Sequence, residues 1–209
     1  SPQAQFNLNP EQCISEDIEA INTTIPGSYP TSSGACAGEV NYDWQVKKPS
    51  FSDFLPVSLL NPSWVVGDDL LIPASDVDEV GCWEIKLIAV NPAACLAESV
   101  YTDTINIEDI PDADFNDIGD ICQNEQITLT DASNIIFAEC DPTLPNETPT
   151  YAWTVSPNSG YVLGNDIDGN PTTLNSQNPV ITFTEVGTYT VDLTVTTECG
   201  SVSYTHLTL

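Results

Sequence analysis

The chain has 209 residues, and its 31 acidic side chains against three lysines give a formal net charge of −28. A field of this sign repels nucleic acid and anionic membranes, so neither is an expected partner. The acidic surplus is typical of a solvated surface, and it also favours divalent cations that would supply counter-charge.

The composition points to an all-β protein of two domains. Hydrophobic residues make up 41% of the chain, with 16 prolines and no methionine. Val, Ile and Thr recur in alternation, and no stretch keeps a 3.6-residue apolar period. The apolar runs are too short for a membrane span, and the start SPQAQF is typical of a mature or excised N-terminus. The length suits two domains of about 100 residues each.

The first expected strands occur twice. AQFNLNPEQCISEDIEAI (residues 4–21) matches ADFNDIGDICQNEQITLT (residues 113–130) without a gap, 109 residues later. Phe6 and Phe115 are expected on a first strand. Residues 18–21 and 127–129 alternate and are expected on a second strand.

Two further blocks follow in the same order. YDWQV (residues 42–46) matches YAWTV (residues 151–155), and VGCWEIKLIAV (residues 80–90) matches VGTYTVDLTVT (residues 186–196). Trp44 and Trp153 should fill the two cores. The strands within residues 80–90 and 186–196 should each bury one face. The predicted buried side chains are Trp83, Ile85, Leu87 and Ala89 in the first repeat and Tyr189, Val191, Leu193 and Val195 in the second. The predicted domains are residues 1–109 and 110–209, with Pro111 at the joint.

The order Phe, Tyr-x-Trp and Gly-x-Tyr-x-Val-x-Leu-x-Val, followed by a last alternating strand, resembles the PKD family of Ig-like β-sandwiches. The resemblance covers both halves, and VGTYTVDLTVTTECGS (residues 186–201) carries it most specifically. It implies two tandem Ig-like (PKD-type) β-sandwich domains from a large bacterial surface or secreted protein. The chain departs from the family after Trp44 and Trp153, where QVKKPS and TVSPNSG replace an Asp-Phe-Gly-Asp-Gly turn.

The seven cysteines include no CxxC pair, so they are expected in disulfides of an oxidising compartment. A strand separates Cys82 from Cys95 by roughly 26 Å, whereas a disulfide needs Cα atoms within about 7 Å. The poles of an Ig-like sandwich favour three pairs: Cys36–Cys95, Cys140–Cys199 and Cys13–Cys82. Cys122 is then odd, either buried and inert or bonded to another module or chain. The sequence alone leaves the connectivity open.

Three acidic stretches are candidate Ca²⁺ sites. Asp166, Asp168 and Asn170 alternate around a glycine as in the first half of a calcium loop, although the same residues suit a plain turn. Asp109, Asp112 and Asp114 lie at the module joint, with Glu108 and Asp117 beside them, and could instead form a solvated linker. SDVDEVG (residues 75–81) is an acidic turn before a strand. No cofactor other than Ca²⁺ is expected.

No catalytic set is visible, so the chain is not expected to be an enzyme. The single histidine, His206, lies in the alternating stretch SVSYTHLTL (residues 201–209), which aligns with SVYTDTINI (residues 99–107). VSYTHLTL also matches the translated read-through of a common sequencing adapter. The sequence alone leaves open whether the residues from about Val202 onward are genuine; with either origin they are expected to form a last strand, in a chain cut off from a longer protein.

Three functions compete, all extracellular and without membrane insertion. The first is a non-catalytic structural or adhesive repeat region of a bacterial surface protein. The second is an accessory spacer or glycan-binding module of a secreted hydrolase. Glycan binding would use exposed aromatics, with Trp64 as the candidate, although a core role for Trp64 fits the sequence equally well. The third is a filament subunit linked through a strand or through Cys122. The expected partners are neighbouring modules of the same or identical chains, and surface glycans or proteins.

Overall fold

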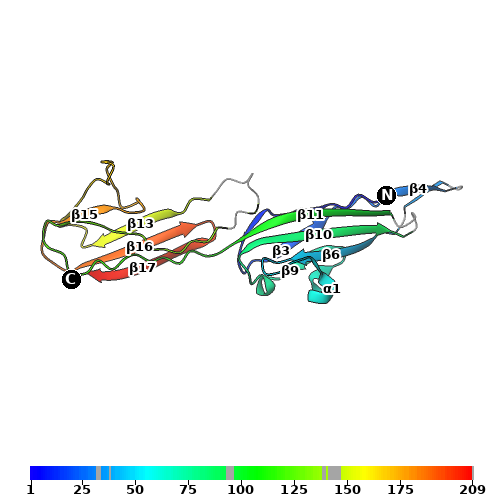
Figure 1. Cartoon of the computed structure of the whole chain (residues 1–209), viewed down its shortest axis with the longest axis horizontal. Coiled ribbons are helices and arrows are strands. Elements are labelled where there is room, and N and C mark those ends of the chain that lie inside the picture. Colours follow the sequence, from blue (N-terminus) through cyan, green and yellow to red (C-terminus); the bar gives the residue numbers. More distant parts are fainter. Residues whose placement is uncertain (32–33, 38, 93–96, 138–139, 141–146, 209) are drawn as a thin grey trace. The chain divides into compact units, whose positions relative to one another are not determined.

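The computed structural model describes residues 1–31, 34–37, 39–92, 97–137, 140 and 147–208 (Figure 1). The chain forms two compact units. The first comprises Ser1–Asp109 together with Phe137–Pro145, and the second comprises Ile110–Ile136 and Asn146–Leu209. The short segment 137–145 thus belongs to the first unit, although it lies within the second sequence repeat.

The first unit is a sandwich of two sheets. One sheet has the order β1-β3-β9-β8, and the other has the order β2-β11-β10-β6-β7. The strands of the first sheet are β1 (Phe6–Leu8), β3 (Ile18–Asn22), β9 (Asp69–Ile72) and β8 (Val65–Val66). Those of the second are β2 (Glu11–Cys13), β11 (Ala97–Glu108), β10 (Gly81–Asn91), β6 (Asn41–Lys47) and β7 (Leu55–Pro56). The remaining elements are the hairpin β4 (Ser28–Thr31) and β5 (Gly34–Ala37), and the short helices α1 (Val57–Leu60), η1 (Pro62–Trp64) and η2 (Ala74–Asp76).

The N-terminal segment changes sheet within a few residues. β1 pairs antiparallel with β3, and after Pro10 the chain joins the opposite sheet as β2, parallel to β11. The amide of Asn106 donates to the carbonyl of Pro10 at the crossing. Proline lacks an amide donor, which suits a point where the chain leaves one ladder for another.

The second unit repeats the sandwich with fewer strands. Its sheets have the orders β12-β15-β14 and β13-β16-β17. The strands are β12 (Gln126–Thr128), β13 (Thr150–Ser156), β14 (Tyr161–Leu163), β15 (Val180–Phe183), β16 (Tyr189–Thr197) and β17 (Gly200–Thr208). The N-terminal part of this unit contributes only single bridges, Asp112 to Asn134 and Phe115 to Asp131.

The two cores follow the predicted alternation. The buried faces of β10 and β16 contain Trp83, Ile85, Leu87, Ala89, Tyr189, Val191, Leu193 and Val195, each at most 6% exposed. The ring centroid of Phe6 lies 5.1 Å from that of Trp44, and Phe115 lies 5.0 Å from Trp153. Period-two burial of this kind is what a half-buried strand requires, and the predicted all-β fold of two tandem Ig-like sandwiches is confirmed.

A polar feature is also repeated at the start of β10 and β16. The indole Nε1 of Trp83 donates to the carbonyl of Glu79 at 2.9 Å. At the matching place, the hydroxyl of Tyr189 lies 3.2 Å from the carbonyl oxygen of Glu185. The two aromatic residues are interchangeable because each has an apolar ring for the core and one polar donor at its edge.

Candidate functional site

The predicted calcium loop of the second unit is closed by its own hydrogen bonds. One carboxylate oxygen of Asp166 accepts from the amides of Asp168 at 3.0 Å and Asn170 at 2.7 Å, and the other accepts from the Asn170 side chain at 3.1 Å. These donors, the Asn170 amide above all, hold the pKa of Asp166 below its ordinary value. Gly169 takes a φ of +84° inside the turn, which L side chains rarely adopt. Ile167 is fully exposed at the tip.

The acidic residues at the joint do not share one arrangement. Asp109 is half-buried, whereas Asp112 and Asp114 are exposed. The Asp114 carboxylate accepts from the amide of Phe115 at 2.8 Å. Among the residues that the structure describes, no three His, Cys, Asp or Glu side chains gather closely enough to hold a metal ion. Calcium at Asp166 or at the joint therefore stays a prediction from the sequence.

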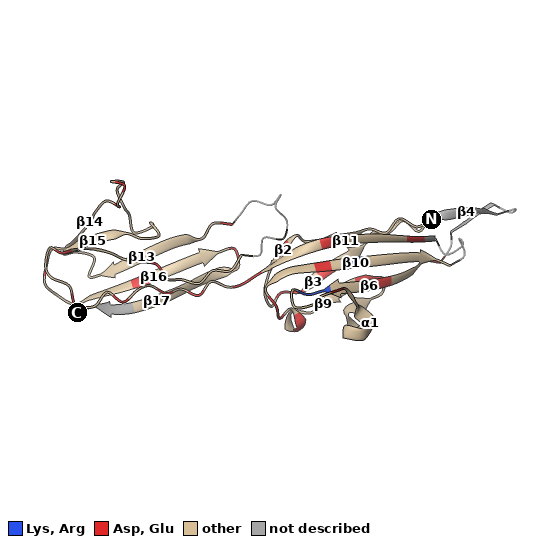
Figure 2. Ribbon diagram, viewed as in Figure 1, with Lys and Arg blue, Asp and Glu red and all other residues tan. Residues whose placement is uncertain are grey.

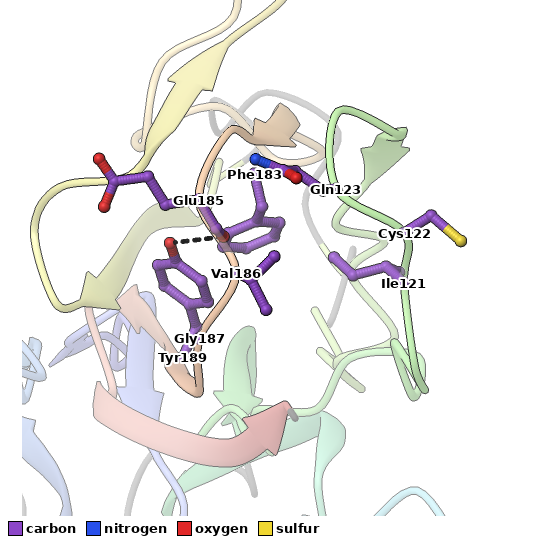
Figure 3. Close-up of a pocket in the computed structure, with 8 residues that line it drawn as sticks. All are labelled: Ile121, Cys122, Gln123, Phe183, Glu185, Val186, Gly187 and Tyr189. Carbon is purple, nitrogen blue, oxygen red and sulfur yellow. Dashed lines mark hydrogen bonds between the residues drawn. The ribbon is translucent and has the colours of Figure 1, made fainter.

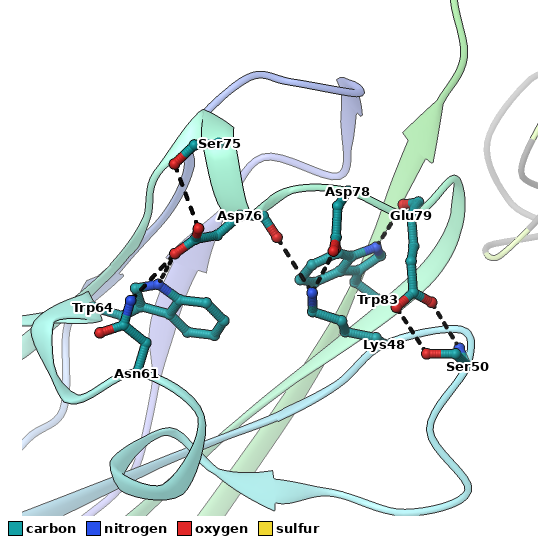
Figure 4. Close-up of polar contacts among 9 residues, drawn as sticks. All are labelled: Lys48, Ser50, Asn61, Trp64, Ser75, Asp76, Asp78, Glu79 and Trp83. Carbon is teal, nitrogen blue, oxygen red and sulfur yellow. Dashed lines mark hydrogen bonds and ion pairs between the residues drawn. The ribbon is translucent and has the colours of Figure 1, made fainter.

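The acidic turn before β10 is bound to a lysine (Figure 4). The ammonium of Lys48 lies 2.6 Å from Oδ1 of Asp78 and 4.7 Å from the ring centroid of Trp83. It also donates to the carbonyl of Asp76 at 3.3 Å. The hydrogen bond from Lys48 lowers the pKa of Asp78. The Lys48 side chain is only 11% exposed, so its charge is neutralised locally.

Trp64 is part of the same network and does not form an exposed platform. It is 4% exposed, and its Nε1 donates to Oδ2 of Asp76 at 2.7 Å (Figure 4). Asn61 donates to the same oxygen at 3.3 Å. The proposed use of Trp64 as an exposed glycan-binding aromatic is thus wrong, because the ring is buried in the first core.

All three lysines lie in the first unit, and the blue ribbon visible in Figure 2 lies there too. Lys47 pairs with Glu84 at 2.6 Å, and the Lys86 ammonium lies 3.5 Å from the ring centroid of Phe54. The second unit has no lysine or arginine, so its carboxylates have no basic side chain of their own unit to pair with, His206 aside.

The disulfide Cys82–Cys140 corrects two predicted pairs. The Cα atoms of Cys82 and Cys140 are 5.4 Å apart, so the pairs Cys13–Cys82 and Cys140–Cys199 are both wrong. The physical reason is that Cys140, although it belongs to the second sequence repeat, lies in the first unit beside the start of β10. Cys13 and Cys199 are also disulfide-bonded. The predicted pair Cys36–Cys95 falls outside the described residues and side chains.

Cys122 is a free, exposed thiol, so of the two alternatives for it the buried one is wrong (Figure 3). It borders a small hollow of about 90 Å³ lined by Ile121, Phe183, Val186 and Tyr189, among others. Figure 3 shows the sulfur directed away from Phe183 and Val186.

His206, the single histidine, lies on β17 opposite Val191 of β16. The alternating stretch that contains it therefore forms a strand, as the sequence predicted.

No family model matches the chain, and no curated protein matches it. Solved structures are similar over its whole length. Immunoglobulin domains 1–4 of Sidekick-1 align with 99% of this chain and 48% of theirs, at 12% identity and a TM-score of 0.51. The fold is Ig-like, in tandem. Two further structures cover this chain similarly, with lower TM-scores. The eight N-terminal Ig domains of Down Syndrome Cell Adhesion Molecule isoform 1.30.30 align with 99% of this chain and 24% of theirs, at 12% identity and a TM-score of 0.48. Three N-terminal domains of the bacteriophage RB49 Highly Immunogenic Outer Capsid protein align with 99% of this chain and 69% of theirs, at 13% identity and a TM-score of 0.46. The chain thus spans about half the length of the Sidekick-1 structure.

No helix among the described residues is long and apolar enough to cross a membrane.

Proposed function

We propose that the chain is a non-catalytic structural and adhesive repeat region of an extracellular protein, of the PKD-like type found on bacterial surfaces. The observation that carries the proposal is the disulfide Cys82–Cys140, which joins a strand of the first repeat to a segment of the second. Such a bond keeps consecutive repeats covalently joined outside the backbone, and disulfides persist in oxidising extracellular compartments.

The polar groups support this role better than a catalytic one. The Asp76, Asp78 and Glu79 carboxylates accept hydrogen bonds from Trp64, Lys48 and Ser50, respectively, and so hold loops in place. Glycan binding through an exposed Trp64 loses its main support, because that side chain is buried. The partners we propose are neighbouring modules of the same or identical chains, with surface proteins or glycans as adhesion targets.

Single-molecule pulling from the two termini tests the structural role. We expect two unfolding events, one for each sandwich. Cys82 and Cys140 are 58 residues apart, so about 210 Å of chain stays hidden until a reductant is added. Cys82→Ser with Cys140→Ser should release that length without reductant. A chain that extends smoothly, with no rupture event, would rule out a force-bearing repeat.

Protease treatment of intact producing cells tests the location. Peptides of this chain should be released before any cytoplasmic marker, because the proposed protein is displayed outside the cell. Release only after lysis would contradict the extracellular assignment and leave the fold unaffected.

A further inference from the structure

The outer face of the smaller sheet in the first unit is hollowed. A recess of about 720 Å³ lies over β1, β3 and β9, beside the segment that crosses to the other sheet. Asn7 lies opposite Ile21, and Glu19 lies opposite Leu71. The residues that alternate with them on β3 and β9 are fully buried in the core, so these side chains face outward. The β3 face is defined here as Asn7, Gln12, Asp17, Glu19, Ile21 and Leu71, which all line the recess.

The second unit covers the matching part of its own sheet. Val180 of β15 lies opposite Thr128 of β12, as Leu71 lies opposite Glu19. Val180 is only 5% exposed, although it does not belong to the core cluster of its unit. The segment between β14 and β15 lies over it, and the hydroxyl of Thr172 in that segment accepts from the Val180 amide at 3.0 Å. This position of the fold therefore accommodates a covering chain segment.

The first unit has no such segment of its own. Gly67 and Asp68 alone join β8 to β9, whereas residues 164–179 join β14 to β15. Leu71 is consequently only half-buried, and Ile21 is 38% exposed. The β3 face thus leaves open a place that the second unit fills.

The β3 face is also acidic where its counterpart is neutral. Asp17 and Glu19 stand where the second repeat has Gln126 and Thr128. Glu19 is exposed, and no lysine lines the recess. The three lysines of the chain are engaged elsewhere in the first unit, with Glu84, Asp78 and the ring of Phe54. The carboxylates of this face therefore lack a cation, and charge complementarity favours one from outside.

One further polar group at the recess lacks a donor. Nε2 of Gln12 donates to the carbonyl of Asp17, but Oε1 of Gln12 is enclosed and has no hydrogen-bond partner within the described part of the chain. An enclosed acceptor without a donor costs free energy. A guest that brings N–H groups to this corner is therefore favoured over one that brings further acceptors.

We propose that the β3 face binds a basic segment of a partner protein, with one arginine or lysine side chain in the recess. The aliphatic part of that side chain lies on Ile21 and Leu71, and its cationic head is attracted by Asp17 and Glu19. The same carboxylates repel phosphate, sulfate and acidic glycans.

Other occupants fit the β3 face less well. No aromatic ring lines the recess, which disfavours a neutral glycan. A second copy of the chain carries the same net charge of −28, and its three lysines are engaged within their own unit. The inference rests on the proposed adhesive role and names the chemistry of one adhesion target. It can fail alone, because pulling and protease treatment test the force-bearing role and the location without any ligand.

The test uses a short fluorescein-labelled peptide of alternating arginine and serine. Fluorescence anisotropy measures its binding to the whole chain at physiological ionic strength. We expect Glu19→Gln to weaken binding about three- to tenfold, because the cationic head loses its carboxylate. The matched control is Glu98→Gln, which removes the same charge from an exposed position on β11, in the other sheet. It should change the Kd by less than about twofold, because a distant charge is screened.

Ile21→Thr and Val100→Thr form a second matched pair. Ile21 is 38% exposed and Val100 of β11 is 50% exposed, so both variants should stay folded. Only Ile21→Thr should weaken binding, by about threefold, because the guest side chain loses apolar surface. A peptide with citrulline in place of arginine keeps the shape without the charge and should not bind.

Several results would overturn the proposal. Equal losses from the Glu19 and Glu98 variants would mean that the peptide responds to net charge alone. Undiminished binding to Ile21→Thr, equal binding of the citrulline peptide, or no binding of the arginine peptide would each contradict the assignment. Displacement of the peptide by a neutral oligosaccharide would assign the β3 face to a glycan instead. Self-association in sedimentation that Ile21→Thr abolishes would assign it to a second copy.

Discussion

The two units share a core and differ at their edges. Both have a central strand with an alternating buried face, β10 in the first and β16 in the second, packed beside a Tyr-x-Trp strand. In the first unit, β2 pairs with the edge of β11 and β7 pairs with the edge of β6, which gives a sheet of five strands. In the second, β13, β16 and β17 form a sheet of three. Repeated core residues therefore specify the sandwich, whereas the local loop sequences decide how its edges are covered.

The largest expected effect tests whether the cores are equivalent. Leu87 and Leu193 are fully buried, and they lie opposite Trp44 and Trp153 of the two Tyr-x-Trp strands, respectively. Leu87→Ala and Leu193→Ala should each lower the free energy of unfolding of its own unit by about 2–5 kcal/mol, because each leaves a cavity.

The readout uses the uneven distribution of tryptophan. Trp153 is the one tryptophan of the second unit, so a Trp153→Phe background restricts the fluorescence to the first. In that background, denaturant unfolding should respond to Leu87→Ala and not to Leu193→Ala. Equal responses would mean that the two sandwiches unfold as one cooperative body.

The next effect concerns the bond between the repeats. Replacing Cys82 and Cys140 together by serine should cost about 2–4 kcal/mol, because the disulfide closes a long loop in the unfolded chain. Thermal unfolding without reductant measures the loss. Cys122→Ser is the control and should leave the midpoint unchanged. If the double variant matches that control, the disulfide contributes nothing to stability.

A smaller effect should distinguish the turns that precede β10 and β16. The turn before β10 is held by the ion pair between Lys48 and Asp78. The turn before β16 is held instead by backbone hydrogen bonds, in which the amides of Thr184 and Glu185 donate to the carbonyl of Gly160. Lys48→Met should cost about 1–2 kcal/mol, because Asp78 and the Trp83 ring lose a nearly buried partner.

Lys47→Met is the matched control for that variant. Its pair with Glu84 is one-third exposed on both sides, so its loss should cost at most about 0.5 kcal/mol. Chemical denaturation of the two variants under identical conditions makes the comparison. A larger loss at Lys47 than at Lys48 would refute the idea that burial decides the contribution.

The sequence predicted the fold well because its signals are local. Alternation over β10 and β16 fixes which side chains face the core, whatever the rest of the chain does. The same reasoning could have found a repeated turn in which a cysteine amide donates to a glutamate carboxylate, since Cys-x-x-Glu recurs at residues 13–16 and 122–125. A glutamate three residues after each cysteine can return its carboxylate to the cysteine amide.

The disulfide pairing, the burial of Trp64 and the ion pair of Asp78 were not predicted, because each depends on a contact that forms only in the folded chain. The Cys82–Cys140 bond depends on which unit segment 137–145 joins, and no periodicity encodes that choice. The burial of Trp64 depends on Asp76, twelve residues later, and the ion pair of Asp78 depends on Lys48, thirty residues earlier. Such pairings follow from tertiary packing, which sequence spacing alone does not determine.

The smallest expected effect is on the pH dependence of stability, because one carboxylate in each unit has a lowered pKa and the cause differs between the units. The pKa values of Asp78 and Asp166 are both lowered, the first mainly by the Lys48 side chain and the second mainly by the Asn170 amide. Each depressed pKa stabilises the fold above the unfolded value near 3.8, and this stabilisation is lost as the pH falls through the folded pKa. Carboxyl NMR titration should show that Lys48→Met returns the pKa of Asp78 toward its ordinary value while that of Asp166 stays low. If both pKa values move together, long-range charge rather than local hydrogen bonding governs these acids. If neither moves, Lys48 is not what lowers the pKa of Asp78.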